Sequence, residues 1–126
     1  MGTKEITSFV PVDPTFPLPH IKQAVEGKLH PDFLQNCTAL TAIPSGVVVG
    51  EKISFSLHVE SVGSFSHTKR TITQELLDIG EVVWQLSPYY KMARPGAIVL
   101  LNYTIYRGDD RMVSLNQQYT VANLTQ

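Results

Sequence analysis

The sequence is poor in cysteine and shows no excess of charge of either sign. Cys37 is the only cysteine among 126 residues, so no disulfide can form within the chain. The sequence also lacks the Cys and His spacing of a structural zinc site. Ten Lys and Arg against eleven Asp and Glu give a formal net charge of −1. Binding of nucleic acid or anionic lipid would therefore need a local cluster of cations.

Long apolar runs and targeting signals are missing as well. The longest apolar run, residues 97–101, is far shorter than the ~20 residues of a membrane-spanning helix. The N-terminus lacks the cationic and apolar regions of a secretion signal, so we expect a soluble protein that is not secreted. A chain of this length buries roughly two thirds of its surface on folding, which supports one domain without disulfides or metal.

Signatures of catalysis are sparse. Neither the phosphate loop nor the dinucleotide-binding glycine pattern occurs. Cys37 lies in a Thr- and Asn-rich segment without a nucleophile signature. His58 and Glu60 share one face of a predicted strand, but the exposed face of a strand produces such pairs by chance. We therefore expect no catalytic residue, metal, cofactor or small-molecule substrate, and no sequence-specific binding of nucleic acid.

Four of the eight prolines, at positions 11, 14, 17 and 19, lie within nine residues. Such a segment forms neither a helix nor a central strand, so residues 1–19 are predicted to be an extended arm before a single domain, 20–126. The interleaved apolar residues favour burial against a surface. The arm then packs on its own domain, inserts into a groove of a neighbouring molecule, or stays disordered; all three alternatives are open. The arm residues expected to insert are Phe9, Pro11, Phe16, Pro17, Leu18 and Pro19.

The remaining pattern predicts an α+β fold. Apolar and polar residues alternate over 53–60, as in a strand with one buried face. Apolar residues at 72, 76, 79, 83 and 86 predict a principal helix over 71–87, ended by Pro88. An apolar run at 97–106 and a second run at 112–121 predict a hairpin around the turn 107–110. The expected architecture is an antiparallel β-sheet packed against one principal α-helix. A short helix over 20–27 and a loop over 38–46 complete the prediction.

Cations flank the predicted helix on both sides. Lys69 and Arg70 lie just before it, and Lys91 and Arg94 lie just after it. If both helix ends approached one surface, the four would form a patch for an anionic membrane or a nucleocapsid.

Three features in order carry a family resemblance. Residues 51–57 read Glu-Lys-Ile-Ser-Phe-Ser-Leu, an amphipathic helix ending near Trp84 would follow, and residues 92–95 read Met-Ala-Arg-Pro. Together they resemble the core of rhabdovirus matrix proteins of the vesicular stomatitis type. That family has a Glu-Lys-Phe-Phe-Phe-Thr-Val strand and, later, a Met-Ala-Gly-Lys-Arg-Pro segment. The basic tail and the budding motifs usual in that family are missing.

The resemblance implies a non-enzymatic structural protein that self-associates, links a nucleocapsid to the inner membrane face, and takes part in budding. It would occur in the virion and in the host cytoplasm or at the inner membrane face. A head-to-tail insertion of the arm would give open assemblies. Two alternatives stay open. One is a small hot-dog-like enzyme or ligand-binding protein with an apolar pocket near His58 or His67. The other is a peptide-binding adaptor that uses an exposed sheet edge.

Overall fold

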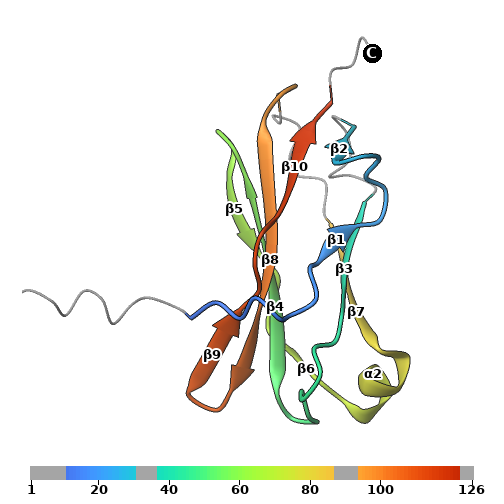
Figure 1. The fold of residues 1–126 in the computed structure, drawn as a ribbon, viewed down its shortest axis with the longest axis vertical. Helices are drawn as coiled ribbons and strands as arrows, with labels where there is room; N and C mark the ends of the chain where they lie inside the picture. The colour runs from blue at the N-terminus through green and yellow to red at the C-terminus, as the bar shows by residue number, and fades with distance from the viewer. Residues whose placement is uncertain (1–10, 31–36, 87–93, 123–126) are drawn as a thin grey trace, which may run out of the picture.

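Two β-sheets pack face to face in the computed structural model, which describes residues 11–30, 37–86 and 94–122 (Figure 1). Neighbouring strands pair in antiparallel fashion, except that β2 pairs in parallel with β10. The larger, seven-stranded sheet has the order β2-β10-β8-β4-β5, with β6 paired to β4 and β9 paired to β8. The smaller sheet has the order β1-β3-β7. The elements are β1 (His20–Ile21), β2 (Lys28–Leu29), β3 (Thr38–Ala42), β4 (Lys52–Val59), β5 (Gly63–Ser66), β6 (Arg70–Thr71), α2 (Gln74–Ile79), β7 (Glu81–Gln85), β8 (Ile98–Arg107), β9 (Asp110–Val113) and β10 (Gln117–Val121).

The centre of the larger sheet is the antiparallel pair β4 and β8, in register from Lys52 opposite Tyr106 to Val59 opposite Val99. Both strands alternate between buried and more exposed residues, and in β4 only Ser54 interrupts this pattern. The prediction of a strand over 53–60 is therefore confirmed, as is that of a strand over 97–106. The start of β8, although apolar at every position, is not covered on both faces, since Ile98 is 38% exposed.

The predicted α+β class is wrong because the principal helix does not exist. Among the described residues only α2 is helical, with Thr73 as its N-cap, and Gly80 ends it in the left-handed conformation at φ 88°. The chain then continues as β7, whose alternate residues Val82 and Trp84 face the core. Ile79, which the helical pattern placed on the buried face, is 62% exposed. After Gly80 the apolar spacing fits a helix and a strand equally well, and pairing with β3 selects the strand.

Three further expectations are corrected or refined. Residues 20–27 contain β1 rather than a helix, and residues 38–46 contain β3 rather than only a loop. The predicted hairpin is present, but its second arm is split into β9 and β10, which pair with opposite ends of β8. At the split, the Ser114 hydroxyl accepts a hydrogen bond from the Tyr103 amide at 3.1 Å. Gly108, at φ 60°, supplies the positive φ that the tight turn before β9 requires.

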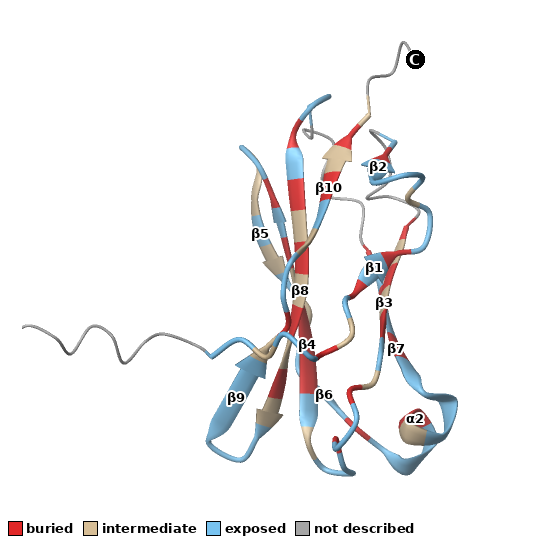
Figure 2. Cartoon of the chain, viewed as in Figure 1, coloured by how far each residue is buried: buried red, intermediate tan, exposed pale blue. Residues whose placement is uncertain are grey.

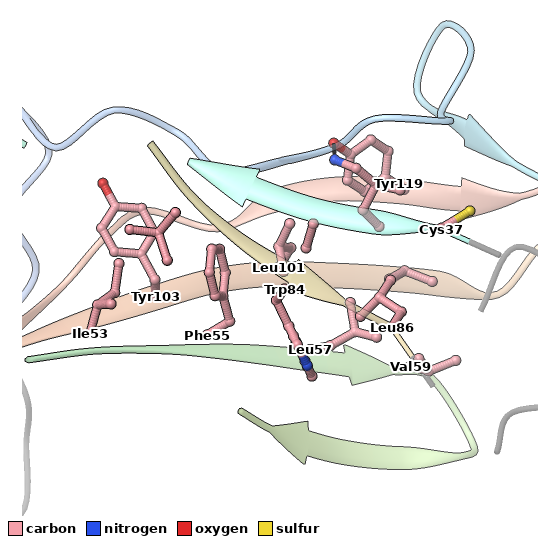
Figure 3. Close-up of a cluster of buried hydrophobic side chains, with 14 of the residues drawn as sticks. Cys37, Ile53, Phe55, Leu57, Val59, Trp84, Leu86, Leu101, Tyr103 and Tyr119 are labelled. Carbon is pink, nitrogen blue, oxygen red and sulfur yellow. Dashed lines mark hydrogen bonds between the residues drawn. The ribbon is translucent and has the colours of Figure 1, made fainter. Parts of the chain in front are cut away.

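The core lies between the two sheets (Figure 2). Phe55 is its aromatic centre, with ring centroids 5.9 Å from Trp84 and 6.1 Å from Tyr103. Figure 3 shows these side chains among the aliphatic residues of β4 and β8, with Tyr119 and Cys37 towards one end. Trp84 comes from the smaller sheet, so this cluster joins the two layers. The second sheet therefore covers the core that the predicted helix was expected to cover.

Candidate functional site

The described part of the proline-rich arm packs on its own domain. Pro11 and Asp13 exchange backbone hydrogen bonds with Val113, at 3.0 and 2.9 Å, so the arm adds a short parallel bridge to the edge of β9. Further along, Phe16 is 8% exposed and its ring stacks on Tyr103. The Tyr103 hydroxyl donates to the Pro17 carbonyl oxygen at 2.6 Å. The structure therefore shows the arm packed on its own domain, which is one of the alternatives that the sequence left open.

The other predicted arm residues contribute unequally. Pro19 is buried and Pro17 is half-buried, whereas Pro11 is exposed and Leu18 is 44% exposed. Phe9 lies outside the described residues. The buried arm residues, Phe16 and Pro19, thus already pack against this domain instead of a neighbouring molecule.

The three predicted cations that the structure describes, Lys69, Arg70 and Arg94, do not form one patch. Arg70 lies opposite Ile53 on β4, and its guanidinium donates to the Val83 carbonyl oxygen of the smaller sheet at 3.3 Å. Arg94 precedes β8 at the other end of the larger sheet, where its carbonyl accepts from the Ala97 amide. Six residues of β4 separate these two ends of the sheet, which is about 20 Å of strand. Lys91 lies outside the described residues.

Strand register brings together a different set of cations on the outer face of the larger sheet. Thr71, Lys52, Tyr106 and Arg111 lie directly opposite one another across β6, β4, β8 and β9. Lys69 joins them, with its ammonium nitrogen 4.2 Å from the centre of the Tyr106 ring. We call Lys52, Lys69 and Arg111 the cation row. Sequence reasoning missed Lys52 and Arg111 because only the pairing of distant strands makes them neighbours.

The rest of the same face is rich in hydroxyl and amide groups. Ser56 lies opposite Asn102, whose amide donates to Asn116 at 2.8 Å. Two residues further along β4, His58 is exposed and its Nδ1 lies 2.8 Å from the Ser64 hydroxyl. These side chains line a shallow open depression rather than a deep apolar pocket. The hot-dog alternative required a sheet wrapped around a helix, and the observed fold contradicts it.

His67 is the other histidine proposed for a pocket, and it lies beside the core. Its ring is 5.6 Å from Trp84 and 6.3 Å from Phe55. Its Nδ1 is buried and has no hydrogen-bond partner among the described residues. Burial lowers the pKa of this imidazole, and the nearby Arg70 guanidinium lowers it further. In the described part of the chain no group of three His, Cys, Asp or Glu side chains could hold a metal ion.

An open sheet edge is the remaining candidate. β7 forms the edge of the smaller sheet, and hydrogen bonds from Leu86 to Cys37 and from Ile43 to Gly80 fix its pairing with β3. In this register Val82 and Trp84 bond to β3, whereas the backbone groups of residues 81, 83 and 85 point away from it. Among the described residues, the Arg70 guanidinium donates a hydrogen bond to one of these outward groups, the Val83 carbonyl oxygen.

Comparison of the chain with protein-family models, with curated proteins and with solved structures finds no match. Within the residues that the structure describes, no helix has the length and hydropathy needed to cross a membrane.

Proposed function

We propose that this chain is a non-enzymatic structural protein that self-associates through the open edge of β7. The observation that carries the proposal is the set of outward-pointing backbone groups at positions 81, 83 and 85. An edge strand of this kind is a template for pairing with a strand of another chain.

The side chains of β7 suit pairing with a second copy of the same strand. In an antiparallel pair centred on Val83, the two valines would lie opposite each other, and each is 39% exposed in the single chain. Glu81 of one copy would lie opposite Gln85 of the other, where the amide can donate to the carboxylate. Such a contact uses the same patch on both copies and closes as a symmetric pair.

In the proposed assembly, Arg70 must leave the Val83 carbonyl oxygen before another strand can pair with this edge. Its guanidinium occupies the Val83 carbonyl oxygen, at 3.3 Å and in an exposed position. An exposed hydrogen bond of this type contributes about 1 kcal/mol or less, so an incoming strand can displace it.

Self-association is the part of the matrix-like role for which the geometry offers support. The links to a nucleocapsid and to the inner membrane face, and the placement in a virion, rest on the resemblance of the quoted segments alone. Trp84, which the resemblance placed near the end of a helix, lies in β7 instead. Insertion of the arm into a neighbour is replaced in this proposal by strand pairing, since Phe16 is already buried in its own domain.

The test is sedimentation velocity over a wide range of protein concentration. Val83→Pro removes an outward-pointing N–H and no hydrogen bond to β3, so the fold is expected to persist while association is lost. Ser64→Pro is the matched control, because Ser64 also points its N–H outward, from the edge of β5. Circular dichroism checks the fold of both variants. A wild-type chain that stays monomeric, or association that survives Val83→Pro, would overturn the proposal.

A further inference from the structure

The cation row stands at one end of a long polar face. Lys52, Tyr106 and Arg111 are directly opposite one another on three adjacent strands, so their side chains emerge side by side on the outer surface. Lys52, Lys69 and Arg111 are all exposed. Three cations this close on one surface attract a phosphate-rich ligand far more than the net charge of the chain suggests.

Tyr106 holds one of these cations in place. The Lys69 ammonium lies 4.2 Å from the ring centre, within the range of a cation–π contact. This contact restricts a flexible side chain before any ligand arrives, which lowers the entropy cost of binding. The Thr71 hydroxyl, opposite Lys52, adds a neutral donor beside the row.

Hydroxyl and amide groups continue from the row along the sheet. Thr104, Ser56 and Asn102 occupy the next positions of β8 and β4 on the same face, followed by His58 and Ser64. From Lys52 to His58 this face extends for about 20 Å. Side chains of these types donate to phosphate oxygens and to the polar edges of bases.

Carboxylates lie mainly at the margins of this face. Glu60 is at the far end, where it accepts from the Ile98 amide at 2.9 Å. Asp109 and Asp110 line the same depression as Lys69 and Arg111, at the end of the cation row beside the β8–β9 turn. Glu51 is paired with Arg107 at 2.9 Å. The favourable path for a polyanion therefore runs from the cation row along β4 and β8, away from the turn.

Three further carboxylates lie on the side of the smaller sheet. Glu75 and Asp78 lie on α2, which Figure 1 places beside that sheet, and Glu81 begins β7. Both sides of the molecule thus carry acidic residues. The attraction for a polyanion would come from the local clustering of Lys52, Lys69 and Arg111.

We propose that the outer face of the larger sheet binds single-stranded nucleic acid without sequence preference, with the cation row contacting its phosphates. The extended run of hydroxyl and amide groups favours a nucleic acid strand over a membrane, which would not use it. The exposed residues Val48 and Val49, in the loop before Lys52, are the feature that a membrane would use, so vesicles form the second arm of the test.

The experiment is fluorescence anisotropy with a fluorescein-labelled oligouridine of about 15 nucleotides, at about 50 and about 200 mM sodium chloride. The wild-type chain is expected to lose affinity with a log–log salt slope of about −2, as three phosphate contacts would give. Lys52→Gln with Arg111→Gln is expected to lower the affinity by about tenfold or more and to reduce the slope to about −0.7.

Lys22→Gln with Arg94→Gln is the matched control, because it removes the same charge from exposed residues outside the row. It should change the affinity by about twofold at most, since distant exposed charges are screened. Tyr106→Ala should weaken binding, and Tyr106→Phe should retain it because the ring still holds Lys69. Circular dichroism checks each variant for folding.

Three outcomes would overturn this inference. They are no binding of oligouridine at the lower salt concentration, an equal loss in the two double variants, and binding confined to vesicles of phosphatidylcholine and phosphatidylserine. Because Val83→Pro leaves the cation row intact, loss of self-association and loss of nucleic acid binding remain distinguishable.

Discussion

Phe16 stacks on Tyr103, with ring centroids 5.9 Å apart and ring planes 7° apart. This pair joins the proline-rich arm to the centre of the larger sheet. The Tyr103 hydroxyl adds a hydrogen bond to the Pro17 carbonyl, and burial raises the pKa of Tyr103 to about 12. The arm is therefore part of the folded domain, at least from the residues that contact β9 onward.

Phe16→Ala should lower the free energy of unfolding by about 3 kcal/mol, because it removes a buried ring and leaves a cavity beside Tyr103. Leu18→Ala is the control, since Leu18 is 44% exposed, and it should change stability by about 0.5 kcal/mol or less. Urea denaturation measures both. Equal, small effects of the two substitutions would mean that the arm does not pack on its own domain.

Tyr119→Phe should destabilise the fold by about 1 to 2 kcal/mol. The Tyr119 hydroxyl accepts a hydrogen bond from the buried Ile21 amide at 2.8 Å and thereby joins β10 to β1 across the sandwich. Removing it leaves that N–H without a partner. The measurement is the urea midpoint at constant m-value. Tyr106→Phe provides the comparison, because no hydrogen bond of the Tyr106 hydroxyl is found among the described residues, and it should leave the midpoint unchanged.

Local patterns predicted β4, β8 and the segment that forms β9 and β10, but not the smaller sheet or the strands β2, β5 and β6 of the larger one. Strict alternation from Ile53 to Val59 has no good helical interpretation, so β4 could be read directly from the sequence. The segment after Gly80 is ambiguous, because its apolar residues satisfy both periods. Only its pairing with β3, a strand expected to be a loop, selects the extended form.

The candidate surfaces were harder to predict than the strands. The sequence places Lys69 and Arg70 together before a predicted helix. In the structure, however, Arg70 points towards the smaller sheet, where it donates to the Val83 carbonyl oxygen. Lys52 and Arg111 belong with Lys69 because of cross-strand register, which is set by long-range pairing and leaves no short-range signal.

Gly80→Ala should lower the free energy of unfolding by about 1 kcal/mol. Gly80 adopts φ 88° where α2 ends, and a side chain in that region is strained. A Cβ there would meet no atom within 4 Å, so the cost is conformational rather than a clash. Gly80→Asn should cost less, because Asn tolerates the left-handed region. Thermal unfolding followed by circular dichroism compares the two, and equal losses would contradict this account.

His67 should make the fold less stable as the pH falls below about 6.5. Its pKa is lowered in the folded chain by burial and by Arg70, so between the folded value and the ordinary value near 6.5 the unfolded chain binds more protons. Stability is then highest above pH 6.5 and decreases as the pH approaches the folded pKa. Urea midpoints at about pH 7.5, 6.5 and 5.5 would follow this decrease.

His67→Phe should flatten that pH dependence, because the replacement keeps a ring against Trp84 and removes the titrating group. His58→Gln is the control, since His58 is exposed, and it should retain the wild-type dependence. Asp13 does not contribute to the pH dependence of stability in this range. The hydrogen bond from the Thr15 hydroxyl to its carboxylate lowers the pKa of Asp13, so it titrates below the range measured. A decrease that persists in His67→Phe and disappears in His58→Gln would assign the pH dependence to the outer face of the larger sheet instead of the core.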